Sequence, residues 1–386
     1  MDKQLYTAKM LANAERMAKQ RGLGEDIFVV DVYAHHMDCT SELVEYIDQP
    51  WRRTLEHAGE QVIPQHIGDR YVAGRLKRKK LPSYKDSSPG ELPAPIEAFK
   101  QASRQLGIDC SIVFPTDILS LGVHPQSALE VAVAKAYARW ITERVLPYDP
   151  SIKTMLFLPF SDARASVELI EEFGEVKGVA GFMVTSVRHQ PVYHNRYMKL
   201  YAALEERQLP IGFHTLDHWS ERPFELFDNF LSAHTVGFPF FNMLQLVNVV
   251  MNGLPQRFPK LKWIFFEAGL AYLPFVMFRL DTAYGMRPSE APILEKKPSE
   301  YMREFYYTTQ PMEYPDDIDH LEALFDMVGR TQLLFSSDYP HWDFDTPSVV
   351  FDLPFLTDDD RRNILGLNAA RLFGLDRDEI KEASSR

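Results

Sequence analysis

The sequence is poor in cysteine and lacks a long apolar run. Two of its 386 residues are cysteines, Cys39 and Cys110, which is too few for a disulfide framework and typical of a reducing compartment. No apolar stretch reads as the ~20-residue segment that spans a bilayer. The opening residues, MDKQLYTAKMLANAERMAKQRG, have no continuous apolar core like that of a signal peptide. We therefore expect a cytoplasmic protein that does not bind membranes.

An excess of positive charge is also missing. The formal net charge is -12 at pH 7, which argues against a general nucleic-acid or anionic-membrane surface. Hydrophobic residues make up 45% of the chain, enough for a large core. The composition therefore favours an enzyme with a small-molecule substrate, and the length suits a single domain only if the fold is a barrel.

A glycine-rich phosphate turn is absent where an open doubly wound sheet would carry it. After the first apolar segment the chain reads His35-His36-Met37-Asp38, with no glycine. Eight apolar segments alternate with helical periodicity, and we predict them as strands over residues 27–36, 111–115, 153–159, 178–184, 210–214, 261–267, 304–309 and 332–337. This order predicts an α/β protein with a (β/α)8 TIM barrel, and an open doubly wound sheet is the alternative.

Two further segments are expected around the barrel. Residues 7–20 predict an N-terminal helix that ends at two glycines. Residues 57–95 combine a basic run, RLKRKK, with many Pro, Ser and Gly residues, which predicts a long insertion or lid after the first strand. We expect residues 1–386 to form one metal-dependent domain that includes this insertion.

Polar residues stand at the carboxyl ends of four predicted strands: His35, His214, Glu267 and Asp338. In a barrel these ends face one common mouth. Imidazole and carboxylate groups that converge there are ligands for one divalent transition metal, Zn, Mn or Fe. A single histidine at a strand end is more often a hydrogen-bonded structural residue, so the prediction depends on four such residues occurring together.

These residues also carry a resemblance to a known family. The segments VVDVYAHH, PIGFH, FPKLKWIFFEAGLAYLPFVMFRLD, LLFSSDYPHWD and ILGLNAARLFGL are similar to the amidohydrolase-related branch of the amidohydrolase superfamily. That branch includes aminocarboxymuconate-semialdehyde decarboxylase, γ-resorcylate decarboxylase and 2-pyrone-4,6-dicarboxylate lactonase. The similarity runs from about residue 27 to residue 374.

The resemblance implies His35 and His214 as metal ligands and Asp338 as a ligand that also acts in catalysis. Tyr33 stands where the family usually has its first ligand, and Glu267 stands where it often has a histidine. Glu267 is therefore expected to be a fourth ligand or a general base. The fourth strand ends in Met183-Val184-Thr185, without the lysine or glutamate of binuclear members, so one metal is expected.

The loops that follow the strand ends supply further candidates. We expect His218 and His341 to transfer protons. We expect Tyr33, His36, Arg188 and Trp342 to contact the substrate. Arg188 could bind a substrate carboxylate through two hydrogen bonds or pair with an acid in a neighbouring loop.

Three functions fit this pattern. The leading hypothesis is hydrolysis of a small-molecule amide, ester or lactone by a metal-activated water. The second is metal-dependent, non-oxidative decarboxylation of an aromatic or unsaturated carboxylic acid. The third is a catalytically altered binding protein, which the substitution at Tyr33 would explain. We also expect a homodimer, with the apolar helix between the fifth and sixth strands as its contact.

Overall fold

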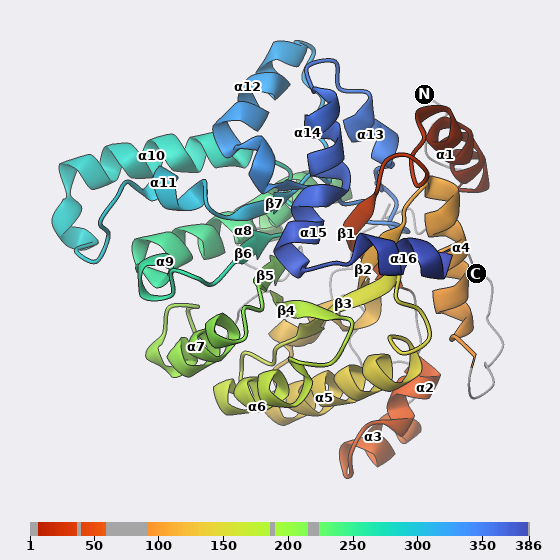
Figure 1. Cartoon of the computed structure of the whole chain (residues 1–386). Coiled ribbons are helices and arrows are strands. Elements are labelled where there is room, and N and C mark those ends of the chain that lie inside the picture. Colours follow the sequence, from red (N-terminus) through yellow and green to blue (C-terminus); the bar gives the residue numbers. More distant parts are fainter. Residues whose placement is uncertain (1–6, 37–39, 59–90, 186–189, 215–223, 385–386) are drawn as a thin grey trace.

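The structure is a computed structural model that describes residues 7–36, 40–58, 91–185, 190–214 and 224–384. Helices surround a ring of strands, and the two chain ends lie on the same side of the molecule (Figure 1). The predicted insertion falls largely between Ala58 and Glu91, outside the described residues, so it remains a prediction. In the described part of the chain, no helix is long and apolar enough to cross a membrane.

All eight predicted strands are present, and they form one parallel sheet in the order β1 to β8. Backbone hydrogen bonds from Val32 N to Phe335 O (3.0 Å) and from Asp338 N to Tyr33 O (2.8 Å) join the segment after the last strand to the first strand and close the barrel. The strands are β1 Val30–His36, β2 Cys110–Pro115, β3 Ile152–Phe157, β4 Val179–Thr185, β5 Ile211–His214, β6 Trp263–Phe265, β7 Tyr306–Thr308 and β8 Leu333–Leu334.

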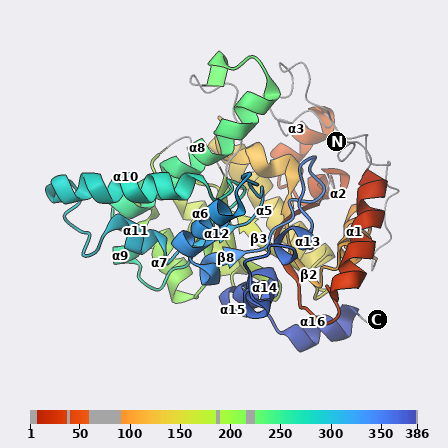
Figure 2. The ribbon, with the colours of Figure 1, turned by 90° about the horizontal axis from the view of Figure 1, so that it is seen from above.

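Helices follow the strands and cover the outside of the barrel, as Figure 2 shows from above. The predicted N-terminal helix is confirmed as α1, and the predicted helix between β5 and β6 is α8. The helices are α1 Thr7–Arg21, α2 Thr40–Glu45, α3 Trp51–Ala58, α4 Ala94–Leu106, α5 Ser127–Arg144, α6 Ala163–Phe173, α7 Met198–Glu206, α8 Phe230–Met251, α9 Leu254–Arg257, α10 Tyr272–Met286, α11 Pro298–Met302, α12 Ile318–Val328, α13 Pro347–Phe351, α14 Asp358–Arg362, α15 Asn368–Phe373 and α16 Arg377–Ser384.

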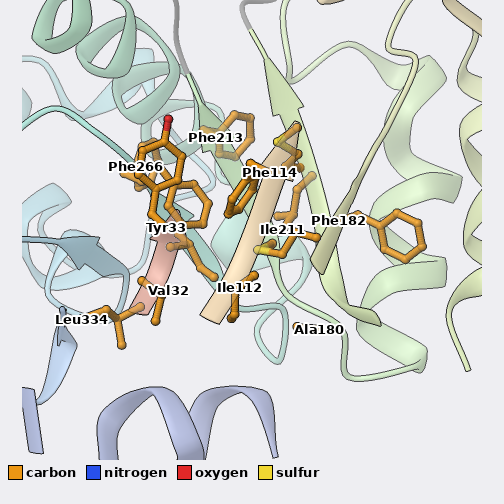
Figure 3. Packing of buried hydrophobic residues seen from close by; sticks show 14 of the residues in the cluster. Val32, Tyr33, Ile112, Phe114, Ala180, Phe182, Ile211, Phe213, Phe266 and Leu334 are labelled. Atoms are coloured by element: carbon orange, nitrogen blue, oxygen red, sulfur yellow. The ribbon is translucent and has the colours of Figure 1, made fainter. Parts of the chain in front are cut away.

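Apolar side chains fill the barrel because both faces of a parallel sheet are buried. Tyr33, Phe114 and Phe266 lie against one another among the strands, with ring centroids 5.1–5.4 Å apart (Figure 3). Gly212 on β5 makes room for this cluster, because a Cβ atom there would lie 2.2 Å from the Phe266 ring. The polar side chains at the carboxyl ends of the strands lie next to this cluster, where Tyr33 contacts His35 and His214.

Several strands are shorter than predicted, and two of them end before residues of the site. The segment predicted over residues 261–267 is a strand only from Trp263 to Phe265, and β8 is only Leu333–Leu334. Glu267 and Asp338, which follow these strands, have positive φ angles of 51° and 59°. That left-handed conformation cannot continue an extended strand, so neither strand extends through these residues.

Candidate active site

Side chains at the carboxyl end of β1 point alternately to the two faces of the sheet. Tyr33 and His35 are fully buried and contact each other edge to face, with ring centroids 4.7 Å apart. His36 lies on the other side of the strand, where its Nε2 is 3.2 Å from the Tyr137 hydroxyl and its ring packs near Trp140. The structure therefore brings Tyr33 and His35 to the mouth and places His36, an expected substrate contact, against α5.

Three residues form a first group at the mouth: His35, Asp338 and His341. His35 Nε2 lies 3.3 Å from Asp338 Oδ1, and His341 Nδ1 lies 2.7 Å from the same oxygen. Ligand atoms of the three side chains all lie within 4.8 Å of one another. Two imidazoles and a carboxylate at this spacing are a donor set for a divalent transition metal.

Tyr33, His214 and Glu267 form a second group. The Tyr33 hydroxyl donates to Glu267 Oε2 over 2.6 Å and also contacts His214 Nε2. His214 Nε2 lies 2.9 Å from the same Glu267 oxygen. Among the described residues, the buried Nδ1 of His214 has no hydrogen-bond partner, so this nitrogen remains available as a ligand atom.

Burial sets the electrostatics of both groups. It raises the pKa of the Asp338 carboxyl well above its usual range, and the nearby charges of Glu267 and Asp343 raise it further. Burial lowers the pKa of His214 to about 3 and keeps its imidazole neutral. Buried acids that face one another are stabilised by a bound cation, and neutral imidazoles can coordinate one. The residues present therefore fit a divalent metal ion.

Backbone strain is concentrated at these acids. Three non-glycine residues in the described chain have positive φ, and Glu267 and Asp338 are two of them. Such conformations cost roughly 1–3 kcal/mol for most residues and tend to occur at functional sites. The fold holds both carboxylates in place at a cost in stability, as expected for residues selected for function.

Several residues that support the site were not expected from the sequence. Gln310, after β7, directs its Nε2 to Asp338 Oδ2 over 3.3 Å, and Thr308 accepts the backbone N–H of Glu267 over 3.0 Å. Thr116, after β2, lies 3.3 Å from His341 Nε2. Each follows or ends a strand, so position after a strand was the only signal that could have identified them.

A rim of aromatic residues connects the β8 loop to α8. Trp342 packs against Phe230 and His234, with ring centroids 5.7 and 5.3 Å away. His234 Nε2 is 3.6 Å from Asp343 Oδ2. Trp342 therefore lies beside the mouth, where it was expected to contact substrate. The expected roles of His218 and Arg188 concern residues outside the described part of the chain.

The chain matches a known protein family over most of its length. The family model described as "Amidohydrolase" matches residues 44–375. A γ-resorcylate decarboxylase of Rhizobium sp. (strain MTP-10005) is 24% identical over 230 residues, which is 57% of this chain and 69% of that protein.

Solved structures show the same fold. An amidohydrolase from Mycobacterium avium subsp. paratuberculosis K-10 superposes with a TM-score of 0.71 at 19% identity, covering 92% of this chain and 99% of the other. A dihydroxybenzoic acid decarboxylase from Polaromonas sp. JS666, with bound manganese and the inhibitor 2-nitroresorcinol, gives a TM-score of 0.63 at 16% identity, with coverage of 92% and 99%. The chain, a TIM barrel with acids and imidazoles at its mouth, is an enzyme that belongs to the amidohydrolase family.

Proposed function

We propose that this enzyme is a metal-dependent carboxy-lyase that removes carbon dioxide from an aromatic or unsaturated carboxylic acid. The observation that carries the proposal is the similarity to γ-resorcylate decarboxylases, 24% identical over 57–62% of this chain. The partly exposed aromatic rim of Trp342 and Phe230 supports it, because an aromatic acid would pack against such rings. From the sequence, hydrolysis was the leading hypothesis and decarboxylation the second; we now favour decarboxylation.

His35 and Asp338 are the residues we propose to hold the ion, because their ligand atoms are 3.3 Å apart and both side chains are buried. His214 Nδ1 is available as a further ligand atom, and Glu267 remains a candidate ligand through its carboxylate. When bound, a divalent ion polarises substrate oxygens and fixes the substrate's orientation. Of the three candidate metals we favour manganese, because a structurally similar decarboxylase contains it.

Decarboxylation breaks the bond between the ring carbon and the carboxylate, and the bonding electron pair stays on that carbon. A proton must then be delivered to the carbon. The Tyr33 hydroxyl holds a proton in its 2.6 Å hydrogen bond to Glu267. We propose that this pair stores the proton and delivers it, while the buried surroundings keep bulk water away from the carbanion-like carbon.

The test is carbon dioxide release from a panel of hydroxybenzoates by the manganese-loaded protein. We expect at least one ortho-hydroxybenzoate to release carbon dioxide and give the corresponding phenol in equal amount. A matched set of esters, lactones and amides serves as the comparison. Turnover confined to that second set would contradict the carboxy-lyase proposal.

Hydrolysis remains the second candidate because of Glu267. A carboxylate that lies 2.9 Å from His214 Nε2 could take a proton from an attacking water and return it to the leaving group. Hydrolysis predicts incorporation of oxygen from labelled water into a carboxylic acid product. The substrate panel with ester, lactone and amide bonds therefore decides between the two reactions.

Tyr33→Phe tests the proposed proton store. The change removes one hydroxyl and keeps the ring contacts with Phe114 and Phe266, so the fold should be unaffected. We expect kcat to fall roughly 10²–10³-fold, within the range for losing a positioned proton donor, with KM and metal content little changed. Steady-state kinetics and metal analysis check this, and an unchanged kcat would remove Tyr33 from the reaction.

We propose that two copies of the chain pair through α8 and α10. Over its 22 residues α8 has no Asp, Glu, Lys or Arg, so copies of a chain with net charge -12 could approach there without repulsion. Large apolar side chains are exposed along both helices: Leu231, Val236, Leu244, Phe275, Phe278 and Met286. Figures 1 and 2 show α10 on the side of the molecule opposite α1 and α16.

We also propose, as expected from the sequence, that the chain forms one domain and is located in the cytoplasm.

The double variant Phe275→Glu/Phe278→Glu should convert the dimer to a monomer. These side chains are 65% and 60% exposed, so the change should not disturb the core, whereas burying four charges in the contact would be costly. Light scattering after size-exclusion chromatography measures the mass. Tyr148→Glu, at an exposed aromatic residue between α5 and β3, is the control. A wild-type monomer, or a dimer that survives the double change, would contradict the proposal.

A further inference from the structure

Of the two groups at the mouth, the first brings together three imidazole or carboxylate side chains, and the second brings together two of them with a phenol. In the second group, the Tyr33 hydroxyl and Glu267 Oε2 both face His214 Nε2. This nitrogen, which could bind a metal, is thus engaged with protein atoms. In the first group, His35 Nε2, Asp338 Oδ1 and the His341 ring lie close enough to share one ion.

His341 is placed by its own segment. It follows Asp338 by three residues, and its backbone N–H donates to the Asp338 carbonyl over 2.9 Å. This tight turn brings its ring to 4.2 Å from the His35 ring. The side chain is 25% exposed, whereas His35 and Asp338 are almost fully buried. His341 is therefore the most exposed of the three side chains.

From this geometry we propose that His341 is a metal ligand beside His35 and Asp338. His341 supplies the ligand that Tyr33, at the usual first-ligand position of β1, does not. The inference rests on the proposed metal-dependent function. Ligand bonds of about 2.0–2.2 Å place neighbouring donor atoms roughly 3 Å apart. The separations of 3.3 Å and 2.7 Å from Asp338 Oδ1 are close to that value. From the sequence, His341 was expected only to transfer protons.

This arrangement separates two tasks. His35, Asp338 and His341 hold the ion, with His214 Nδ1 as the further ligand atom, while Tyr33 and Glu267 remain joined by a hydrogen bond beside it and handle the proton. A chain that has a phenol in place of its first ligand can then keep a complete metal site. The alternative is that His341 only orients Asp338 through the 2.7 Å contact with Nδ1.

Two substitutions distinguish these roles. In His341→Asn the amide can still donate a hydrogen bond to Asp338, but it is a poor ligand for a transition metal. In His341→Asp the carboxylate can coordinate an ion, but it repels Asp338 when no ion is bound. A ligand role predicts that the Asp variant binds Mn²⁺ more tightly than the Asn variant, and an orienting role predicts the reverse.

The experiment is titration of metal-free wild-type and variant proteins with Mn²⁺, followed by electron paramagnetic resonance. We expect His341→Asn to weaken binding more than about 100-fold, beyond the 10–100-fold typical of residues that only orient a ligand. Nitrogen couplings to bound Mn²⁺ should show one fewer histidine in His341→Asp than in wild type. Trp342→Phe, the neighbouring residue, should bind like wild type, and thermal melts establish that each variant is folded.

The outcomes separate this inference from the proposed function. If wild type binds Mn²⁺ and His341→Asn binds it within 10-fold with all nitrogen couplings kept, the His341 assignment is wrong and the metal-dependent function stands. If folded wild-type protein binds no divalent ion, both are wrong.

Discussion

Asp338→Asn is expected to lower kcat/KM by roughly 10³–10⁴-fold, toward the upper end of what one positioned acid–base group contributes. Asp338 contacts His35 over 3.3 Å and His341 over 2.7 Å, so the amide would remove the only carboxyl group of that set. Asparagine tolerates the left-handed backbone that this position requires, with φ at 59°. The loss should therefore come from chemistry and metal binding, not from misfolding.

The measurement pairs kinetics with metal analysis of the same samples. Asp345→Asn is the matched control, because Asp345 is a largely buried acid of the same loop whose carboxylate accepts the Met312 N–H over 2.9 Å, and an amide oxygen can do the same. We expect the control to keep its metal and most of its activity. An Asp338→Asn protein with normal turnover would place the site elsewhere.

Asp31→Ala is expected to destabilise the fold by about 3 kcal/mol or more, because it would leave three buried donors without an acceptor at about 1–3 kcal/mol each. The Asp31 carboxylate accepts the Ser337 N–H over 2.9 Å, the Ser337 hydroxyl, and the Tyr33 N–H over 3.2 Å. These bonds connect β1 to the segment after β8, where the barrel closes beneath the active site.

Asp31→Asn tests whether the loss of stability comes from the missing hydrogen bonds or from any change of residue 31. Its amide oxygen can still accept the two backbone N–H groups, so we expect a clearly smaller loss than for alanine. Chemical denaturation of metal-free protein measures both variants. Equal stability of Asp31→Ala and wild type would show that this contact does not help to close the barrel.

The sequence predicted the barrel because parallel strands buried on both faces give apolar runs that are easy to recognise. It also predicted that His35, His214, Glu267 and Asp338 would stand at strand ends. It did not predict how they divide into two groups. That division depends on the phenol of Tyr33 reaching Glu267 across the barrel, over 234 positions of sequence, and no local pattern encodes such a contact.

Strand alternation places Tyr33 and His35 on one side of β1 and His36 on the other, although all three were expected at the site. The residue that receives it, Tyr137, lies on α5, and only the packing of that helix shows that His36 is already engaged. Gln310 was missed for a similar reason. It follows a three-residue strand, and nothing in the sequence indicates that its amide points to Asp338.

The most direct test of the account is the activity of metal-free protein before and after addition of Mn²⁺. The protein is stripped with a chelator, shown to be folded, and assayed for carbon dioxide release with the best substrate of the hydroxybenzoate panel. If the enzyme is a metal-dependent decarboxylase, the protein should show no turnover without metal and full recovery at one Mn²⁺ per chain. Full turnover in the metal-free protein would contradict it.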